Sequence, residues 1–216
     1  MRTWAKRIRL AAGVAAIWAT PATAIESVWA RLPAGLPADS MAAPLHRIEA
    51  TGPRPTAAGA AYALGQFHMA RGEYPLAAAA FGRAAARLEG HDRGEARYRQ
   101  GVAFLGEREP GKARAAFEEV AMLSQTLRAL AQLGLAQSFV LAGERERAID
   151  VLRRLLDGPA AEAEPAALAR YVALCERAHR EADVAAARAR LARRWPRSFE
   201  AALLPPPHAG KPAGAP

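Results

Sequence analysis

Three copies of one sequence pattern follow one another in this chain, and they constrain its fold more than any other feature. The copies begin at Ala61, Arg97 and Gln132, align without gaps, and repeat with a period of about 36 residues. Each copy carries two small residues, and a large apolar residue follows the second of them. The small residues are Gly65, Gly101 and Ala136, then Ala77, Ala113 and Ala148, and the large ones are Phe81, Phe117 and Leu152. This period predicts stacked units, because one such unit cannot bury its apolar face alone.

Each copy predicts two antiparallel helices joined by a short break. In the first copy Gly72 marks the end of the first helix, and Pro75 suits the first turn of the second. Thr56 is expected to cap the first helix, and Gly90 to stop the second. Much of the apolar content is alanine, which favours helix, and runs of strand-forming residues are scarce. The sequence therefore predicts an all-α protein.

Small side chains let two helices approach closely, so the recurring small residues should lie where the two helices of a pair meet. Gly65 is expected to face Ala77, and Gly101 to face Ala113. Phe81 and Phe117 should then fill the space toward the neighbouring pair. A weaker fourth copy, residues 171–194, places Cys175, Ala187 and Leu191 at the matching positions.

The copies resemble the tetratricopeptide repeat (TPR) family. The first copy carries the family's motif at Leu64, Gly65, Gly72, Tyr74, Ala77, Phe81 and Ala84. The second keeps Gly101, Ala113 and Phe117, and the third keeps Gly143, Ala148 and Leu155. The resemblance covers about residues 57–196. It implies a right-handed superhelical solenoid of antiparallel helix pairs, with three clear repeats and one degenerate repeat.

The first 24 residues have the order of a secretory signal peptide. Basic residues between Arg2 and Arg9 precede an apolar stretch from Leu10 to Ala19, and small residues end the segment at Ala24. This order predicts export, with cleavage after Ala24 and a periplasmic location. An uncleaved anchor in the inner membrane, facing the periplasm, and an ordinary amphipathic helix are the alternatives.

The remaining segments differ in composition. Residues 25–55 are proline-rich and predict a linker with one short helix around Ser40 to Ala50. Residues 56–200 should form the repeat domain. Residues 201–216 are rich in Pro, Gly and Ala and predict a disordered tail.

Nothing in the sequence predicts catalysis, a cofactor or a metal site. No nucleophile elbow, phosphate loop or dinucleotide fingerprint is present, and the five histidines are scattered without the spacing of a zinc helix. His68 is expected to be a satisfied core or boundary residue, and Cys175 to be a packing residue. The chain is therefore predicted not to be an enzyme.

The TPR resemblance implies that the first helix of each pair lines a groove for a protein or peptide segment. By register, the groove residues would be Tyr62, Gln66, Met69, Tyr98, Val102, Leu105, Leu133, Gln137 and Val140. They mix aromatic, aliphatic and amide groups, which suits an amphipathic ligand. The alternative is that some of them pack against residues 25–55.

A run of arginines near the end of the fourth copy forms the densest charge cluster. It consists of Arg188, Arg190, Arg193, Arg194 and Arg197. One reading is a solvated helix end favoured by the helix dipole. The other is a docking face for an acidic protein, anionic lipid head groups or a wall polymer. The formal net charge of +9 does not itself indicate nucleic acid, because acids and bases are interspersed beyond the basic N-terminus.

These observations predict an exported, non-catalytic scaffold that mediates protein–protein interactions in the cell envelope. The segment from Leu191 to Leu203 resembles the break between repeats in periplasmic TPR proteins, a group that includes the Tol-Pal accessory proteins. The alternative is a structural subunit of a homo-oligomer or envelope complex, held by an uncleaved N-terminal anchor. Membrane contact is expected only in that second case.

Overall fold

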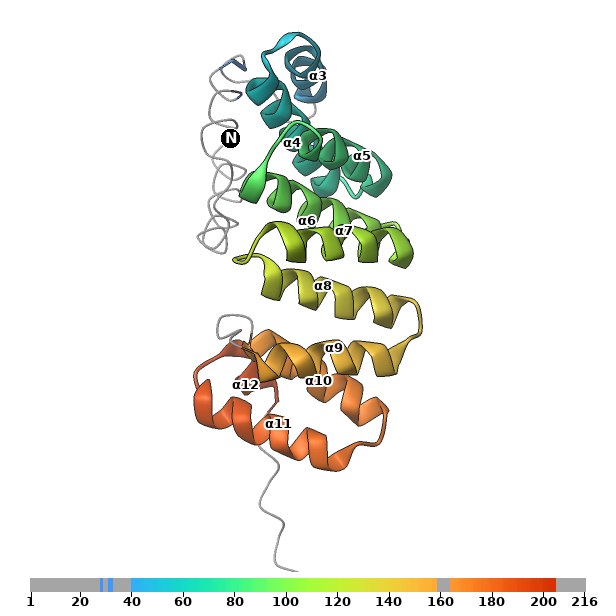
Figure 1. The fold of residues 1–216 in the computed structure, drawn as a ribbon, viewed down its shortest axis with the longest axis vertical. Coiled ribbons are helices and arrows are strands. Elements are labelled where there is room, and N and C mark those ends of the chain that lie inside the picture. Colours follow the sequence, from blue (N-terminus) through green and yellow to red (C-terminus); the bar gives the residue numbers. More distant parts are fainter. Residues whose placement is uncertain (1–27, 29–30, 33–39, 159–163, 205–216) are drawn as a thin grey trace, which may run out of the picture. The chain divides into compact units, whose positions relative to one another are not determined.

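The computed structural model describes residues 28, 31–32, 40–158 and 164–204, and the regular structure of these residues is helical throughout. The expected signal peptide and most of the expected tail lie outside these ranges. Figure 1 shows the helices in chain order. They are α3 (Ala42–Thr51), α4 (Arg54–Ala70), α5 (Tyr74–Ala85), α6 (Gly90–Gly106), α7 (Pro110–Leu123), α8 (Arg128–Leu141), α9 (Arg145–Asp157), α10 (Glu164–Arg177), α11 (Glu181–Arg194) and α12 (Phe199–Leu203). The prediction of an all-α fold built from helix pairs is confirmed.

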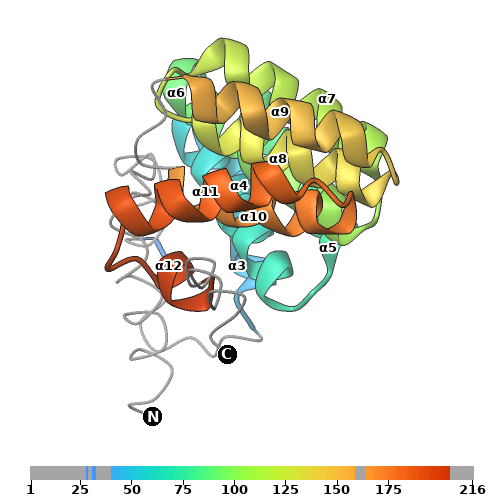
Figure 2. The ribbon, with the colours of Figure 1, turned by 90° about the horizontal axis from the view of Figure 1, so that it is seen from below.

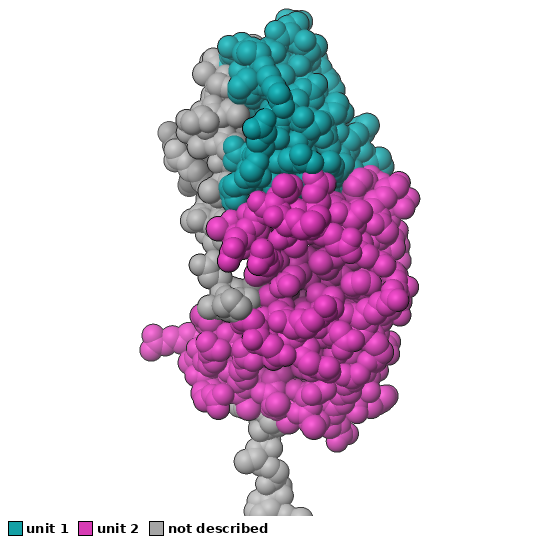
Figure 3. Space-filling view, viewed as in Figure 1, with its two compact units in different colours: residues 1–103 teal, residues 104–216 magenta. Residues whose placement is uncertain are grey.

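The chain divides into two compact units, residues 1–103 and residues 104–216, which Figure 3 distinguishes by colour. The boundary falls inside α6, near the middle of the expected repeat domain. In the first unit α4 packs against both α3 and α5. In the second unit α8 packs against α7 and α9, and α10 packs against α9 and α11.

The turn between α4 and α5 follows the sequence prediction. Helix α4 ends at Ala70, and Gly72 has a φ of 73°, a left-handed conformation that glycine adopts without a steric penalty. Pro75 lies in the first turn of α5, where its missing N–H leaves no helical hydrogen bond unmade.

Two predicted helix ends are wrong. Helix α4 begins at Arg54, so Thr56 is a buried residue of its first turn and caps nothing. The reason is Pro55, whose fixed φ suits the first turn of a helix and moves the start upstream. Helix α5 ends at Ala85, and Gly90 does not stop it. Gly90, with a φ of 54°, instead begins α6.

The recurring alanines are buried, as predicted from the repeat pattern. Ala77, Ala113 and Ala148 have 0% of their surface exposed, and Ala187 has 5%. Cys175 and Leu191 of the fourth copy are fully buried too. The degenerate copy therefore packs at the same positions as the clear ones.

The contact partner of Phe81 differs from the prediction. Its ring lies on Gly65, where an added Cβ would come within 2.6 Å of the ring atoms. The glycine therefore accommodates an aromatic ring of its own helix pair, a contact that the sequence did not predict. Its ring also meets Tyr62 edge-on, with 5.3 Å between centroids. In the second unit the ring of Phe117 lies on Gly134 of α8, the first helix of the next pair, as predicted for Phe117.

Part of the expected linker belongs to the packed first unit. Leu45 of α3 is fully buried, and it clusters with Val28 and with Ala60, Ala63 and Leu64 of α4. On the same helix the carboxylate of Glu49 accepts hydrogen bonds from Arg83 at 2.7 Å and from Arg87 at 3.4 Å. Helix α3 thus covers an apolar face of the first helix pair that would otherwise meet water.

Helix α12 completes the second unit. The hydroxyl of Ser198 accepts a hydrogen bond from the backbone N–H of Ala201 at 3.1 Å, which is a standard N-cap interaction. The helix contacts α10 and α11, and it lies beside them in Figure 2. Helical structure therefore continues to Leu203, into the segment expected to be the tail.

We expect Gly134→Ala to lower the free energy of unfolding by about 1 to 3 kcal/mol, because its Cβ would overlap the ring of Phe117 at 2.6 Å. Gly111→Ala is the matched control. Gly111 lies near the start of α7 with nothing within 4 Å of an added Cβ. That change should be neutral or stabilise the fold by up to about 1 kcal/mol. Urea unfolding followed by circular dichroism measures both, and equal effects would contradict the Phe117 contact.

Candidate partner-binding surface

Residues from three helices of the second unit line a small hollow that is open to solvent. It has a volume of about 230 Å³. Its lining residues are Ala136, Gln137 and Val140 from α8, Leu152 from α9, and Arg170, Ala173, Leu174 and Arg177 from α10. We call this site the α8–α10 hollow.

The floor of the α8–α10 hollow is apolar. Ala136, Leu152 and Leu174 are buried, and Val140 is half-buried beside them. Because these side chains come from three helices that pack on one another, the fold itself holds the floor in place. An apolar floor with a polar rim is typical of sites that bind a ligand through a few anchoring side chains.

The rim of the α8–α10 hollow carries two exposed arginines. Arg170 and Arg177 are seven residues apart on α10, so they lie on one side of the helix, two turns apart. Neither guanidinium forms an ion pair with another residue in the described part of the chain, although the backbone carbonyl of Arg177 accepts a hydrogen bond from Arg145. Gln137 adds an exposed amide on the side of α8. The rim therefore offers N–H donors to a carboxylate or an amide.

The nine predicted groove residues fall into three groups, according to their burial and whether they line the α8–α10 hollow. Tyr62 is fully buried and Leu133 is 6% exposed, so neither offers surface to a partner. Five are half-buried and line none of the described hollows: Gln66, Met69, Tyr98, Val102 and Leu105. Only Gln137 and Val140 line the α8–α10 hollow. The prediction that Tyr62 and Leu133 face a partner was wrong, because the side chains of these two residues pack in the core of their units.

Tyr62 belongs to a buried polar network that the sequence did not predict. Its hydroxyl donates to Oε1 of Glu95 at 3.0 Å, and Arg99 Nε donates to the same oxygen at 3.0 Å. Burial raises the pKa of Tyr62, so its hydroxyl stays protonated and remains a donor. Glu95 is 1% exposed, so the network joins α4 to α6 inside the first unit.

The lining residues from α10 were also missed. The groove residues expected from the sequence come from the first three copies alone. In the fourth copy the same register gives Val172, Glu176 and His179, whereas the hollow is lined by Arg170, Ala173 and Arg177. The spacing of i, i+3, i+4 and i+7 among the four lining residues is the signal that could have found them.

Comparisons with known proteins find the fold but no family. No family model matches the chain, and no curated protein matches it. One similar solved structure holds nearly identical TPR-like repeats of a protein described as a kinesin light chain from Podosopora anserina. It is 16% identical, has a TM-score of 0.59, and covers 72% of this chain and 85% of that chain. The fold is TPR-like.

A second solved structure, PilF of Pseudomonas aeruginosa, is 18% identical with a TM-score of 0.48. It covers 77% of this chain and 80% of that chain. At such identities a likeness concerns the fold alone.

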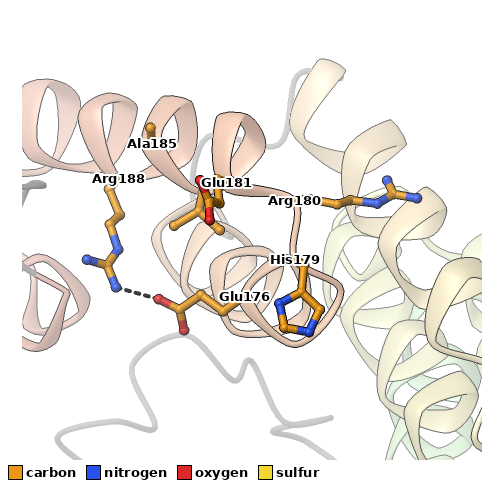
Figure 4. Close-up of a pocket in the computed structure, with 7 residues that line it drawn as sticks. Glu176, His179, Arg180, Glu181, Ala185 and Arg188 are labelled. Atoms are coloured by element: carbon orange, nitrogen blue, oxygen red, sulfur yellow. Dashed lines mark hydrogen bonds and ion pairs between the residues drawn. The ribbon is translucent and has the colours of Figure 1, made fainter.

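The predicted basic patch is largely engaged within the protein. Arg190 and Arg194 both donate to Oε1 of Glu164, at 2.5 and 3.0 Å, and Glu164 is 4% exposed. Arg188 pairs with Glu176 across an open hollow of about 270 Å³, which Figure 4 shows with the ion pair as a dashed line. Three of the five arginines therefore have acidic partners. Arg193 and Arg197 are exposed and form no ion pair with another described residue.

His68 and Cys175 have the structural roles expected from the sequence. His68 is 9% exposed, and its Nδ1 lies 2.7 Å from Oε2 of Glu73. Hydrogen bonds from Arg71 and then from His68 lower the pKa of Glu73, so this carboxylate holds the turn after α4 in its ionised form. Burial raises the pKa of the Cys175 thiol, which disfavours the reactive thiolate.

Two further searches concern only the described residues. They contain no group of His, Cys, Asp or Glu side chains arranged to hold a metal ion. Among their helices, none has the length and apolar character needed to cross a bilayer.

Proposed function

We propose that this chain is an exported, non-catalytic scaffold that holds a segment of a partner protein in the α8–α10 hollow. The observation that carries the proposal is the hollow itself. Three packed helices build its apolar floor, and its rim carries two arginines that form no ion pair with another described residue. The TPR-like fold supports the proposal, because stacked helix pairs present extended binding surfaces.

The size of the hollow favours a protein segment over a small molecule. At about 230 Å³ it is smaller than the roughly 300 to 1,000 Å³ of typical small-molecule pockets. It is also open, so it can receive one or two side chains from a larger ligand that lies across it. This form of recognition anchors a helix or an extended segment by its apolar residues.

The rim specifies the chemistry of that segment. Arg170 and Arg177 would pair with Asp or Glu side chains or with a C-terminal carboxylate. Leu152 and Leu174 would receive an apolar residue of the segment, and Gln137 would bond its backbone or an amide. The proposed ligand is therefore an acidic amphipathic segment.

The location is part of the proposal. The basic, apolar and small-residue order of residues 1–24 supports export to the cell envelope. A partner there would be another envelope protein. In the structural-subunit alternative, with an uncleaved N-terminal anchor, the partner is a second copy of this chain or another subunit of an envelope complex.

Site-specific photo-crosslinking tests the proposal. A photoreactive amino acid at Ala173, which is exposed and lines the hollow, should crosslink one partner in intact cells. The same amino acid at Asp150, which is exposed on α9, should not. Mass spectrometry then identifies the crosslinked protein and the segment that was bound.

Charge reversal tests whether the rim arginines take part. Arg170→Glu with Arg177→Glu should abolish the Ala173 crosslink, because the rim would repel an acidic segment. The matched control is Arg128→Glu with Arg154→Glu, since these exposed arginines bond to backbone carbonyls and form no ion pair with another described residue. Crosslinks that survive charge reversal would reject an acidic segment as the ligand, and the absence of any crosslink at Ala173 would reject the hollow as the site. Crosslinks between two copies of this chain would favour the structural subunit instead.

A further inference from the structure

Helix α12 exposes two large apolar side chains at the end of the described chain. Phe199 is 74% exposed and Leu203 is 62% exposed. They are four residues apart and so lie on one side of the helix. The opposite side is packed, because Ala201 and Leu204 lie against the core of the second unit. Apolar residues therefore occupy both sides of this short helix, and one of these sides is turned toward solvent.

Positively charged residues lie close to this apolar pair in the sequence. Residues 193–204 contain three arginines and one glutamate. Arg193 and Arg197 are exposed and form no ion pair with another described residue, and Arg197 precedes Phe199 by only two residues. Two large apolar side chains are exposed to water here, and two nearby arginines have no acidic partner among the described residues. Both features lower the free-energy cost of moving this part of the chain to an anionic, apolar boundary.

We propose that α12 docks this protein on an anionic membrane surface. Phe199 and Leu203 would enter the boundary between head groups and acyl chains, and Arg193 and Arg197 would lie at the level of the phosphates. Aromatic and leucine side chains on one side, with arginines beside them, are the chemistry of surface-lying helices. The contact does not require the N-terminal segment, and it is separate from the α8–α10 hollow.

The small size of the apolar pair favours a membrane over a protein partner. A stable protein interface buries about 800 Å² on each partner with matched shapes. Two protruding side chains on a helix of one turn supply far less than that. A lipid surface needs no matching shape, because it deforms around the inserted side chains and its charge attracts the arginines.

Vesicle co-sedimentation of the full chain tests the proposal. The protein should bind vesicles containing phosphatidylglycerol and bind much less to vesicles of phosphatidylcholine. Phe199→Ser with Leu203→Ser should weaken binding to the anionic vesicles at least about tenfold, because two apolar side chains no longer insert. Arg193→Gln with Arg197→Gln should weaken it by roughly fivefold for each arginine, and raised salt should act in the same direction.

Matched variants separate this surface from other sources of binding. Leu76→Ser with Met122→Ser removes two apolar side chains that are 53% and 79% exposed elsewhere, and it should leave vesicle binding unchanged. Arg170→Gln with Arg177→Gln should also leave it unchanged, although this change should impair partner capture by the hollow. Residues 1–24 are common to every variant, so their contribution cancels.

Two results would overturn the proposal. Equal vesicle binding by the chain and by its Phe199→Ser, Leu203→Ser variant would show that another segment makes the contact. A fall in the mass measured by light scattering for that variant, without a change in vesicle binding, would show that α12 is an interface between copies of this chain.

Discussion

Phe81→Ala should lower the free energy of unfolding by about 3 to 5 kcal/mol. Phe81 is fully buried, with its ring on Gly65 and edge-on to Tyr62. Removing the ring leaves a cavity that Gly65 cannot fill, because glycine has no side chain. Whole domains are stable by only about 5 to 15 kcal/mol, so the variant should lie close to the unfolding threshold at 37 °C. Urea unfolding at 25 °C measures the loss.

Phe199→Ala is the matched control for Phe81→Ala. Phe199 is 74% exposed, so its truncation should change stability by less than about 0.5 kcal/mol. Phe81→Leu should fall between the two, because leucine keeps most of the apolar volume. A loss for Phe81→Ala as small as that for Phe199→Ala would contradict the buried ring.

A double-mutant cycle tests the contact between the ring and the glycine directly. In the natural chain, Gly65→Ala should cost about 1 to 3 kcal/mol, because its Cβ would meet the ring at 2.6 Å. In the Phe81→Ala background the same change should stabilise the protein by up to about 1 kcal/mol, since alanine favours helix and the space is free. The change of sign distinguishes a specific contact from general crowding, which would add the two effects.

The fold was predictable from the sequence where local rules and periodicity agree. Gly72 and Pro75 mark the turn between α4 and α5 by backbone preferences that act within a few residues. Ala77 and Ala113 are buried because the spacing of the copies places them between helices. Both kinds of signal repeat along the chain, so each copy supports the others.

Pairings between distant charged residues were not predictable in this way. In the sequence Arg190 and Arg194 belong to a run of arginines, but their partner Glu164 lies 26 and 30 residues earlier. The repeat register predicts that Tyr62 is a groove residue, but its hydrogen-bond partner Glu95 lies 33 residues later. Periodicity gives the side of a helix on which a residue lies. It does not give the element that packs on that side.

The candidate site was predicted only in part for the same reason. Gln137 and Val140 line the α8–α10 hollow, as the register of the first helices implied. Arg170 and Arg177 line it from α10, which belongs to the fourth copy. This copy matches the repeat pattern weakly, so the pattern does not fix which residues of α10 face the hollow. Charged residues at exposed helix positions are common, so their types alone could not single them out.

Glu95→Ala should lower the free energy of unfolding by about 3 kcal/mol. The carboxylate of Glu95 accepts hydrogen bonds from Tyr62 and Arg99 at 3.0 Å each, and the residue is 1% exposed. Its removal leaves a buried hydroxyl and a partly buried guanidinium without their acceptor. The Arg99 side chain is 28% exposed and regains some water, which keeps the loss near the lower end of the range for buried ion pairs.

Two milder variants should resolve the contributions of the network. Tyr62→Phe removes one hydrogen bond and leaves the Glu95–Arg99 pair, so it should cost only about 1 kcal/mol. Glu95→Gln keeps an oxygen for the Tyr62 hydroxyl but removes the charge that Arg99 faces, so its cost should fall between the other two. This order, measured by urea unfolding, follows from a carboxylate that serves two donors at once.

Glu118→Ala is the matched control for Glu95→Ala, because Glu118 is an exposed glutamate in the interior of α7. Its loss should change stability by less than about 0.5 kcal/mol. If Glu95→Ala cost no more than Glu118→Ala, Glu95 would be solvated, and the hydroxyl of Tyr62 would be free to face a partner. A large loss of stability for Glu95→Ala would instead show that Tyr62 holds α4 to α6 through the buried network. That result excludes Tyr62 from a binding surface.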